Sequence, residues 1–434
     1  MLSALGLIGG LTLLIVLTIR GMNLLLSAPL CALLVALSAG MAVFPQNADS
    51  NFLHSYMDGF TGFVASWFFI FLLGALFGKL MEDSGAAESV ANWIVKRFGS
   101  QRAPLAIVIA CAVLTYGGVS LFVVAFSVYP LALMLFRQAD LPRRFIPGVI
   151  GFGSVTFTMT SAGSPEIQNW IPIKYLGTTP YAAWEVSAIV AVTMAVTGYW
   201  WMSSMLRKAQ QRGESFAARY DDPQLLEREL PHPLAGVVPL LVVLATSYAL
   251  HDRLQESALL VALLAGCLST LLISWRYFMH LNQAIHQGTV GALVAIGNTS
   301  AVVGFGSVAK ATPAFALAVE TMTGIPGDPL IGAAVAVSAI AALTGSASGG
   351  QAIALPELAP GYLEAGVNPE QLHRVVAISS GALDSLPHNG YVVTTIRAIC
   401  GETHRHAYGP MGALTVIVPL GGLALALLLF SLGL

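Results

Sequence analysis

The chain has 434 residues, of which 56% are hydrophobic and 10% are charged, and its mean hydropathy is +0.76. A soluble domain has roughly 25% charged residues, so this composition excludes an ordinary soluble protein and predicts a chain that is solvated mainly by lipid. The net charge of −2 gives no reason to expect a nucleic-acid partner. The four cysteines are scattered and most lie in apolar runs, which argues against a disulfide framework.

The first half of the chain, residues 1–206, contains apolar segments long enough to cross roughly 30 Å of hydrocarbon. In chain order we expect membrane spans at 2–20, 23–44 and 62–81, an amphipathic segment at 86–98, a helical hairpin at about 104–137, a broken helix at about 145–176 and a span at 182–206. The two arms of the hairpin, 104–115 and 121–137, are short for crossing a bilayer, which indicates a re-entrant hairpin. Thr, Ser, Gly and Pro residues at 160–165 interrupt the broken helix.

A polar stretch at 207–232 divides the chain almost in half and is predicted to be a cytoplasmic linker. Residues 233–434 then repeat the order of elements: spans at 234–250, 257–275 and 288–308, an amphipathic segment at 313–323, a hairpin at about 329–363, a broken helix at about 373–399 and a span at 411–433. The predicted fold class is therefore an all-α polytopic membrane protein with two repeats. If the hairpins are re-entrant, each half crosses five times, so the second half is inverted relative to the first.

The basic residues give an independent test of orientation. With the amino terminus outside, all of the 20 basic residues except Lys174, Arg253, Lys310 and Arg374 fall on the cytoplasmic side. Cytoplasmic loops of membrane proteins carry an excess of Lys and Arg. We therefore expect a bacterial inner-membrane protein with both termini on the periplasmic side.

The two hairpin turns and the two helix breaks form the candidate substrate site. A helix is interrupted at bilayer depth only where protein or a water-filled cavity receives the freed backbone groups. The starts of half-helices carry partial positive charge and attract carboxylates. The alternative is that each run of small residues is only a seam for close helix packing, but four runs at matching places favour a site for a small anion. The candidate ligand residues are Thr115, Gly117, Gly118, Ser120, Thr160, Ser161, Gly163, Ser164, Gln168, Asn169, Thr344, Ser346, Ser348, Gly349, Ser385 and Asn389.

Ionisable residues in the breaks are the candidates for proton coupling. These are Glu166, Asp384 and His388, and both Glu166 and His388 directly follow a proline, which suggests pseudo-symmetric partners. Charge inside a membrane is costly and is usually retained for transport or proton relay. Histidine changes its protonation near neutral pH. The alternative is capping, in which Asp384 or Asn389 binds free N–H groups at a break.

Three other polar groups lie outside this predicted site. Glu357 in the second hairpin can face either the site or the outer vestibule, and 298–300 (Asn-Thr-Ser) is expected to make hydrogen bonds between helices rather than to contact substrate. Cys400, His404 and His406 have roughly metal-ligand spacing, but their segment also carries other charged residues and is expected to be a solvated loop. No metal and no cofactor is expected, and the coupling ion is expected to be H+.

Several of these segments together resemble the gluconate permease (GntP) family of the ion transporter superfamily, and most closely its branch of D-beta-hydroxybutyrate permeases. The segments are GGVSLF at 117–122, TMT at 158–160, GSP at 163–165, IQN at 167–169, TGSASGG at 344–350 and LDSLPHNG at 383–390. The resemblance covers essentially the whole chain. It departs from that branch at Glu166, where the family pattern leads us to expect Gln.

The resemblance implies a proton symporter of short hydroxy acids or sugar acids. It also implies inverted five-span repeats, a separate scaffold, a homodimer and an elevator-type motion. The substrate carboxylate is expected near mid-membrane on Ser, Thr and Asn side chains and backbone N–H groups, with no arginine in direct contact. An extra carboxylate at Glu166 would repel such a ligand unless it is protonated.

The competing classes are a channel, a membrane-embedded enzyme and a sodium-coupled carrier. The sequence has neither the His-Glu-x-x-His motif of a metalloprotease nor the Gly-rich phosphate loop of an ATP-driven pump, so no enzymatic activity is expected. Paired hairpins favour alternating access over a continuous channel. Sodium coupling remains the nearest alternative, because carbonyl groups at helix breaks also coordinate sodium.

Overall fold

The computed structural model describes residues 2–44, 51–98, 102–220, 222, 229–255, 257–323, 325 and 328–434. Within these residues the regular structure is helical, apart from one isolated bridge between Ala42 and Asn51. The predicted linker at 207–232 falls partly outside them, because 221 and 223–228 are not described.

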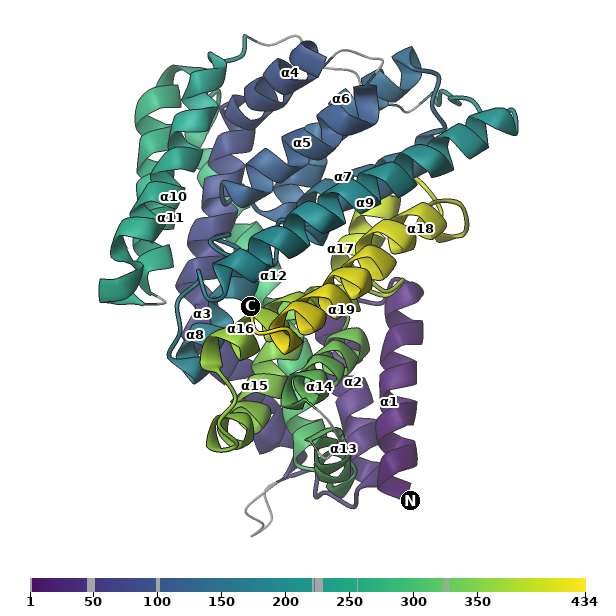
Figure 1. The fold of residues 1–434 in the computed structure, drawn as a ribbon, viewed down its shortest axis with the longest axis vertical. Coiled ribbons are helices and arrows are strands. Elements are labelled where there is room, and N and C mark those ends of the chain that lie inside the picture. Colours follow the sequence, from purple (N-terminus) through teal and green to yellow (C-terminus); the bar gives the residue numbers. More distant parts are fainter. Residues whose placement is uncertain are drawn as a thin grey trace.

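Two long helices, α3 (Phe52–Asp83) and α12 (Leu281–Lys310), pack against each other along much of their length. Small residues allow the close approach: a Cβ atom on Gly59 would lie 2.5 Å from the Ser307 Cβ atom. The Tyr56 hydroxyl donates to the carbonyl of Ala301 at 3.0 Å and joins the two helices. Helices α1 (Leu2–Ile19) and α2 (Leu24–Ser38) pack together, and α2 contacts α12. In the same way α10 (Pro233–Leu254) and α11 (Ser257–Ser274) pack together, and α11 contacts α3 (Figure 1).

Each half then has a short helix and a helical hairpin. The short helices are α4 (Ala86–Phe98), which packs on α5 and α10, and α13 (Pro313–Thr323), which packs on α14 and α1. The hairpins are α5 (Ala103–Tyr116) with α6 (Leu121–Gln138), and α14 (Pro329–Thr344) with α15 (Ala347–Glu364). Both turns contain a glycine with positive φ, Gly118 at +92° and Gly345 at +59°, a conformation that other residues adopt only with strain.

The broken helices follow the hairpins. The first consists of α7 (Ile146–Gly151) and the π-helix η3 (Phe152–Thr156), an irregular segment at 157–166, and then η4 (Ile167–Asn169) and α8 (Ile171–Leu176). The second consists of α16 (Pro369–Ala382), an irregular segment at 383–389, α17 (Gly390–Val393) and the π-helix η6 (Thr394–Ile399). Below, "first break" means 157–166 and "second break" means 383–389. The last helices of the halves are α9 (Trp184–Gln211) and the continuous stretch α18 (His404–Gly412), η7 (Ala413–Ile417) and α19 (Val418–Ser431), and α9 packs on α19.

The helix bounds differ from the predicted ones at several places; the second span, for example, ends at Ser38 and not at 44. Seven helices among the described residues are long and apolar enough to cross a membrane: Phe52–Asp83, Leu121–Gln138, Trp184–Gln211, Pro233–Leu254, Ser257–Tyr277, Leu281–Lys310 and His404–Ser431. The third span of each half is longer than expected, since α3 and α12 have 32 and 30 residues. The last span begins at His404 and not at 411. The arm α6 is also long enough to qualify as a span, so the expectation that both arms are too short was wrong for α6; re-entry of the hairpins stays a prediction.

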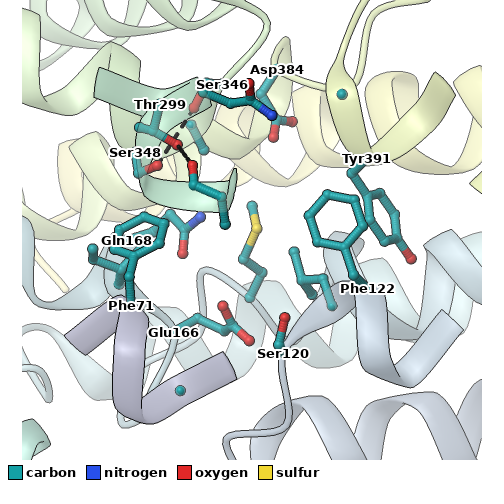
Figure 2. Close-up of a pocket in the computed structure, with 18 of the residues that line it drawn as sticks. Phe71, Ser120, Phe122, Glu166, Gln168, Thr299, Ser346, Ser348, Asp384 and Tyr391 are labelled. Carbon is teal, nitrogen blue, oxygen red and sulfur yellow. Dashed lines mark hydrogen bonds between the residues drawn. The ribbon is translucent and has the colours of Figure 1, made fainter. Parts of the chain in front are cut away.

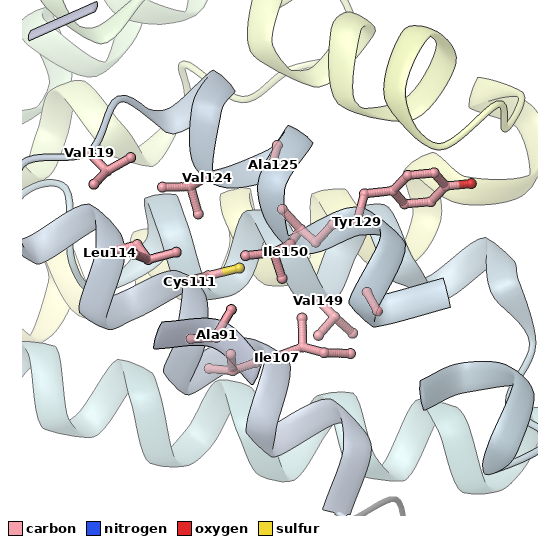
Figure 3. Close-up of a cluster of buried hydrophobic side chains, with 14 of the residues drawn as sticks. Ala91, Ile107, Cys111, Leu114, Val119, Val124, Ala125, Tyr129, Val149 and Ile150 are labelled. Carbon is pink, nitrogen blue, oxygen red and sulfur yellow. The ribbon is translucent and has the colours of Figure 1, made fainter. Parts of the chain in front are cut away.

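The hydrophobic core extends between the short helix, the hairpin and the broken helix of the first half. Figure 3 shows Ile107, Cys111 and Leu114 of α5 facing Val124 of α6 and Ile150 of α7. All four cysteines are buried and unpaired by disulfides. In the segment expected to be a solvated loop, Cys400 and Glu402 are buried, whereas Gly401, Thr403, Arg405 and His406 are exposed.

Candidate functional site

A cavity of about 270 Å³ lies where the two hairpin turns, the two breaks and the helices α3 and α12 meet. Both hairpin turns contact the break of their own half. A Cβ atom on Gly118 would lie 3.3 Å from Pro165, and one on Gly345 would lie 2.8 Å from the His388 ring. The cavity is lined by Leu24, Ile70, Phe71, Gly74, Ala75, Gly118, Ser120, Leu121, Phe122, Val155, Met159, Pro165, Glu166, Ile167, Gln168, Leu263, Ala295, Asn298, Thr299, Val302, Thr344, Gly345, Ser346, Ala347, Ser348, Asp384, Ser385, Asn389, Gly390 and Tyr391.

Helices begin at this cavity in both halves. Ser120 is the residue before α6, and its hydroxyl makes no capping hydrogen bond to that helix. Ser346 precedes α15 and accepts a hydrogen bond from the N–H of Gly349 at 3.1 Å, while its hydroxyl lies 3.4 Å from that of Ser348. Asn389 precedes α17 and accepts from the N–H of Val392 at 2.9 Å. The first turn of a helix leaves N–H groups without intrahelical partners, so the cavity wall is rich in hydrogen-bond donors.

Two carboxyl groups face the cavity, Glu166 from the first break and Asp384 from the second. In the view of Figure 2 they lie on opposite sides of it, Glu166 beside Ser120 and Asp384 beside Ser346. Asp384 accepts a hydrogen bond from the Ser385 hydroxyl at 2.9 Å. The Glu166 carboxyl has no hydrogen bond and no ion pair with any residue that the structure describes. His388 lies outside the lining, and its Nε2 atom is 2.9 Å from the carbonyl oxygen of Ala342.

Aromatic rings form another part of the wall. Phe71 of α3 lies on one side in Figure 2, and Phe122 of α6 lies with Tyr391 of α17 on the other. The rings of Phe122 and Tyr391 meet edge to face with centroids 5.6 Å apart. None of these three rings was among the predicted site residues, because an aromatic residue in an apolar helix looks the same whether it faces lipid or a cavity.

Helix α12 also contributes polar groups that the sequence analysis assigned elsewhere. Asn298 and Thr299 line the cavity, although we expected them only to join helices. The Thr299 hydroxyl donates to the carbonyl of Ala295, one turn earlier in its own helix, at 3.1 Å. Ser300 is fully buried and points away from the lining. The polar residues at 298–300 within a long apolar helix were the sequence feature that could have predicted this contact with the cavity.

Ten of the predicted residues line the cavity: Gly118, Ser120, Glu166, Gln168, Thr344, Ser346, Ser348, Asp384, Ser385 and Asn389. The others lie nearby but outside the lining: Thr115, Gly117, Thr160, Ser161, Gly163, Ser164, Asn169, Gly349 and His388. Most of these serve the local fold. Gly117 lies against Leu240 and Gly163 against Tyr181, while the Ser161 hydroxyl donates to the carbonyl of Phe157.

The side of the first break away from the cavity is held by hydrogen bonds from Asn169 and Trp170. Asn169 donates to the carbonyl of Met159 at 3.0 Å, and the ring N–H of Trp170 donates to the carbonyl of Ser164 at 3.3 Å. Gln351 of α15 donates to the carbonyl of Gln168 at 3.1 Å and to the Ser380 hydroxyl at 2.9 Å. Candidate ligands in this region thus hold the shape of the break.

Glu357 belongs to neither the cavity lining nor the first break. Its carboxylate pairs with Lys310, at the end of α12, with 2.5 Å between the two charged groups. No group of three His, Cys, Asp or Glu residues suited to a metal ion occurs in the part of the chain that the structure describes.

Comparison with known proteins fixes the family. Residues 2–247 match the family described as GntP family permease. The uncharacterized transporter YxjC of Bacillus subtilis is 38% identical over 92% of this chain and 92% of its own. The chain belongs to the GntP family of permeases. It is therefore a multi-pass membrane transporter and not an enzyme.

More distant relatives of this GntP permease include proteins with named substrates. The high-affinity gluconate transporter of Escherichia coli is 30% identical over 34% of the permease and 32% of its own length. The crystal structure of the YdaH transporter from Alcanivorax borkumensis covers 97% of the permease and 99% of its own chain, with a TM-score of 0.51 and 14% identity. At this identity the likeness concerns the fold alone.

Proposed function

We propose that this GntP permease is a proton-coupled symporter of small hydroxycarboxylates, such as 3-hydroxybutyrate or a sugar acid like gluconate, in the inner membrane. One observation carries the proposal: helices from both halves begin at a single cavity that also contains two carboxyl groups. Binding of an anion and binding of a proton are thereby brought to one place.

The donors of the cavity suit a carboxylate. Helices α6 and α15 both have 18 residues and begin at the wall with Ser120 and Ser346. Their N-terminal ends carry partial positive charge and exposed N–H groups, the usual setting for a bound anion. The lining contains no Lys or Arg, so we propose that N–H groups and hydroxyls hold the carboxylate.

The unpaired carboxyl of Glu166 is the best candidate for the coupled proton. A charged group without a partner in a membrane cavity is costly, and an incoming carboxylate beside it adds repulsion. A proton on Glu166 removes both penalties and provides a donor for the substrate. Release of the proton on the other side of the membrane would then favour release of the substrate.

Apolar and aromatic surface on the same cavity favours a short acid with an apolar tail over a fully hydroxylated one. Phe71, Phe122 and Met159 offer no hydrogen bonds, whereas a sugar acid carries a hydroxyl on each carbon after the carboxylate. Gluconate is nevertheless the substrate named for a relative. Both compounds therefore belong in the first test.

Alternating access by an elevator motion is supported by the matching contacts of the two halves. α3 contacts α11 and α6, and α12 correspondingly contacts α2 and α15; α4 packs on α10 as α13 packs on α1. We propose two inverted repeats in which the hairpins and broken helices move against α3 and α12. The homodimer and the periplasmic termini belong to the same proposal and rest on the family resemblance and on the distribution of basic residues.

The decisive experiment is uptake of labelled 3-hydroxybutyrate into proteoliposomes with an imposed pH gradient, with and without sodium, and with gluconate, lactate and glycerate as competitors. We expect saturable uptake that requires the inward proton gradient and ignores sodium. Uptake driven only by sodium would show that the coupling ion is sodium and not H+, and would support a sodium symporter. Competition by gluconate alone would move the substrate to the sugar acids, and non-saturable flux would support a channel.

A further inference from the structure

Arg374 of α16 is completely buried and donates five hydrogen bonds. Its Nη1 atom is 2.7 Å from the carbonyl oxygen of Thr160 and 2.8 Å from Oδ1 of Asn169. Its Nε and Nη2 atoms donate to the carbonyl of Ala182 at 3.1 and 2.9 Å, and Nη2 also donates to that of Pro180 at 3.3 Å. All of these acceptors are neutral, and Arg374 forms no ion pair with a carboxylate in the described part of the chain.

Two of the acceptors of Arg374 are close to Glu166 along the chain, because Thr160 lies in the first break and Asn169 lies just after it, in η4. Thr160 follows Met159, and Asn169 follows Gln168; Met159 and Gln168 both line the cavity. Arg374 itself lies outside the lining and comes from the opposite half of the chain. The guanidinium is therefore placed behind the part of the cavity wall that Met159 and Gln168 form.

A buried charge without a counter-ion is expensive, so its presence needs a compensating interaction. Carbonyl oxygens at the end of a half-helix carry partial negative charge and compensate part of it. In a low-dielectric interior the remaining field reaches across several ångströms. The cavity is a region where negative charge gathers, with Glu166, Asp384 and an anionic substrate, and its lining contains no cation.

We infer that Arg374 is a positioning residue that makes the cavity selective for anions without touching them. It holds Thr160 in the first break and Asn169 just after it, and it supplies the positive potential that the lining lacks. This inference rests on the proposed function, since it concerns the carboxylate of the same substrate. A purely structural brace would hold the break in the same way but would not distinguish a charged ligand from a neutral one of the same shape.

The test compares two ligands that differ in charge but hardly in shape, 3-hydroxybutyrate and 3-hydroxybutyramide. Their affinities are measured by calorimetry on the full-length purified permease in lipid nanodiscs, for wild type, Arg374→Gln and Arg374→Lys. We expect Arg374→Gln to lower the affinity for the carboxylate at least ten-fold more than the affinity for the amide. Arg374→Lys keeps the charge. It should lower the affinity for both ligands but preserve the preference for the carboxylate.

Two controls separate charge from geometry. Arg397→Gln makes the same change of charge in the second broken helix, where the side chain is exposed and pairs with His404 at 3.2 Å, and should leave the ratio of affinities unchanged. Asn169→Ala removes one acceptor but no charge, so it should weaken both ligands equally. If Arg374→Gln does not fold, the Lys and Asn169→Ala variants still decide the matter through the same ratio.

Equal weakening of both ligands in Arg374→Gln, or loss of the preference in Arg374→Lys, would overturn the inference and leave a structural brace. The proposed substrate is judged from the wild type alone. If wild type binds neither compound but binds gluconate, the substrate class changes and the same comparison is made with gluconate and gluconamide.

Discussion

The two helix breaks have similar places in their halves, each after a hairpin, yet they are held in different ways. The first break is held by its own half, through Asn169 and Trp170, and also by the other half, through Arg374 of α16, which donates to the carbonyl of Thr160. The second break is held by its own half: His404 lies 3.0 Å from the carbonyl of Pro387, and the Tyr408 hydroxyl donates to that of Ser385 at 3.2 Å. Repeated sequence patterns thus predict repeated elements but not equivalent support. The first break therefore depends in part on how the two halves dock, and matched substitutions in the two halves can test this difference.

The largest expected effect separates the two carboxyl groups. Glu166→Gln should abolish proton-driven accumulation, at least a hundred-fold, because the unpaired carboxyl is the proposed proton carrier; exchange of substrate across the membrane without a gradient should persist. Asp384→Asn is the matched control and should keep a proton dependence, since Asp384 already has a hydrogen-bond donor in Ser385. Uptake and exchange in proteoliposomes measure both. If only Asp384→Asn loses proton coupling, Asp384 in the second break, and not Glu166, is the proton carrier.

The next effect concerns two adjacent arginines that tie the linker to the broken helices. Arg143 is buried and pairs with Asp222 at 2.8 Å and with Glu402, which follows the second broken helix, at 3.0 Å. Removing one partner of a buried pair costs about 3 kcal/mol or more, so Arg143→Gln should lower the thermal unfolding temperature clearly. Arg144→Gln should cost less than about 1 kcal/mol, because Arg144 and its partner Glu214 are partly exposed. Equal losses in the two variants would contradict this ranking.

The same pair gives a pH dependence. Arg144 donates two hydrogen bonds to Glu214 and lowers the pKa of that carboxyl from its usual value. A group with a lowered pKa in the folded state stabilises above its unfolded pKa and loses this contribution as pH falls. Proteolysis of the linker in wild type should therefore be constant from pH 8 to 5 and increase only near or below about pH 4.3, the ordinary Glu value. In Arg144→Gln this acid-dependent increase should be smaller.

A smaller effect distinguishes the serines at the hairpin turns. Ser120 does not cap its helix and is free to bind substrate, so Ser120→Ala should raise KM about ten-fold, the loss of roughly one hydrogen bond to a charged group, with little change in stability. Ser346 caps the N–H of Gly349, and Ser346→Ala should cost about 1 kcal/mol of stability. Uptake kinetics and thermal unfolding of both variants test the contrast. A stability loss in Ser120→Ala with unchanged KM would reverse the assignment.

The smallest expected effect is on the uptake rate and concerns the ion pairs at the ends of α3 and α12. Lys310 pairs across to Glu357 of the hairpin arm α15, whereas Lys79 pairs with Glu82 and Asp83 of its own helix. Glu357 directly follows Pro356, and the residue after Pro130, at the same distance from the start of α6, is Leu131. The second half therefore has an ionic contact between its long helix α12 and its hairpin arm α15, and the first half has the apolar residue Leu131 at the position that corresponds to Glu357. Glu357→Gln should change the uptake rate two- to three-fold at low salt and less at high salt, since exposed pairs contribute below about 1 kcal/mol.

The charge exchange Lys310→Glu with Glu357→Lys is the control for that contact and should restore the wild-type rate. Lys79→Gln should leave the rate unchanged, because its contacts do not cross between α3 and the hairpin. An equal effect of Lys79→Gln would show that general surface charge, and not the contact with α15, sets the rate.

The sequence by itself determined the membrane class, the number and order of the helical segments, and ten of the lining residues. Long apolar runs and runs of Gly, Ser and Pro are local properties, and they are visible without knowledge of the fold. The repeat architecture, the elevator motion and the coupling ion stay predictions that rest on this order and on the family resemblance.

Only the tertiary structure decided which face of each segment meets the cavity. Thr160 lies in the first break with Glu166, and Asn169 lies just after it, but the Thr160 carbonyl and the Asn169 side chain accept hydrogen bonds from Arg374 while Glu166 faces the cavity. Phe71 and Asn298 line the cavity, although they belong to spans that had no expected role in binding. A residue's neighbours in space depend on how helices from both halves pack, and in a chain this apolar the hydrophobic pattern does not distinguish lipid from protein or cavity.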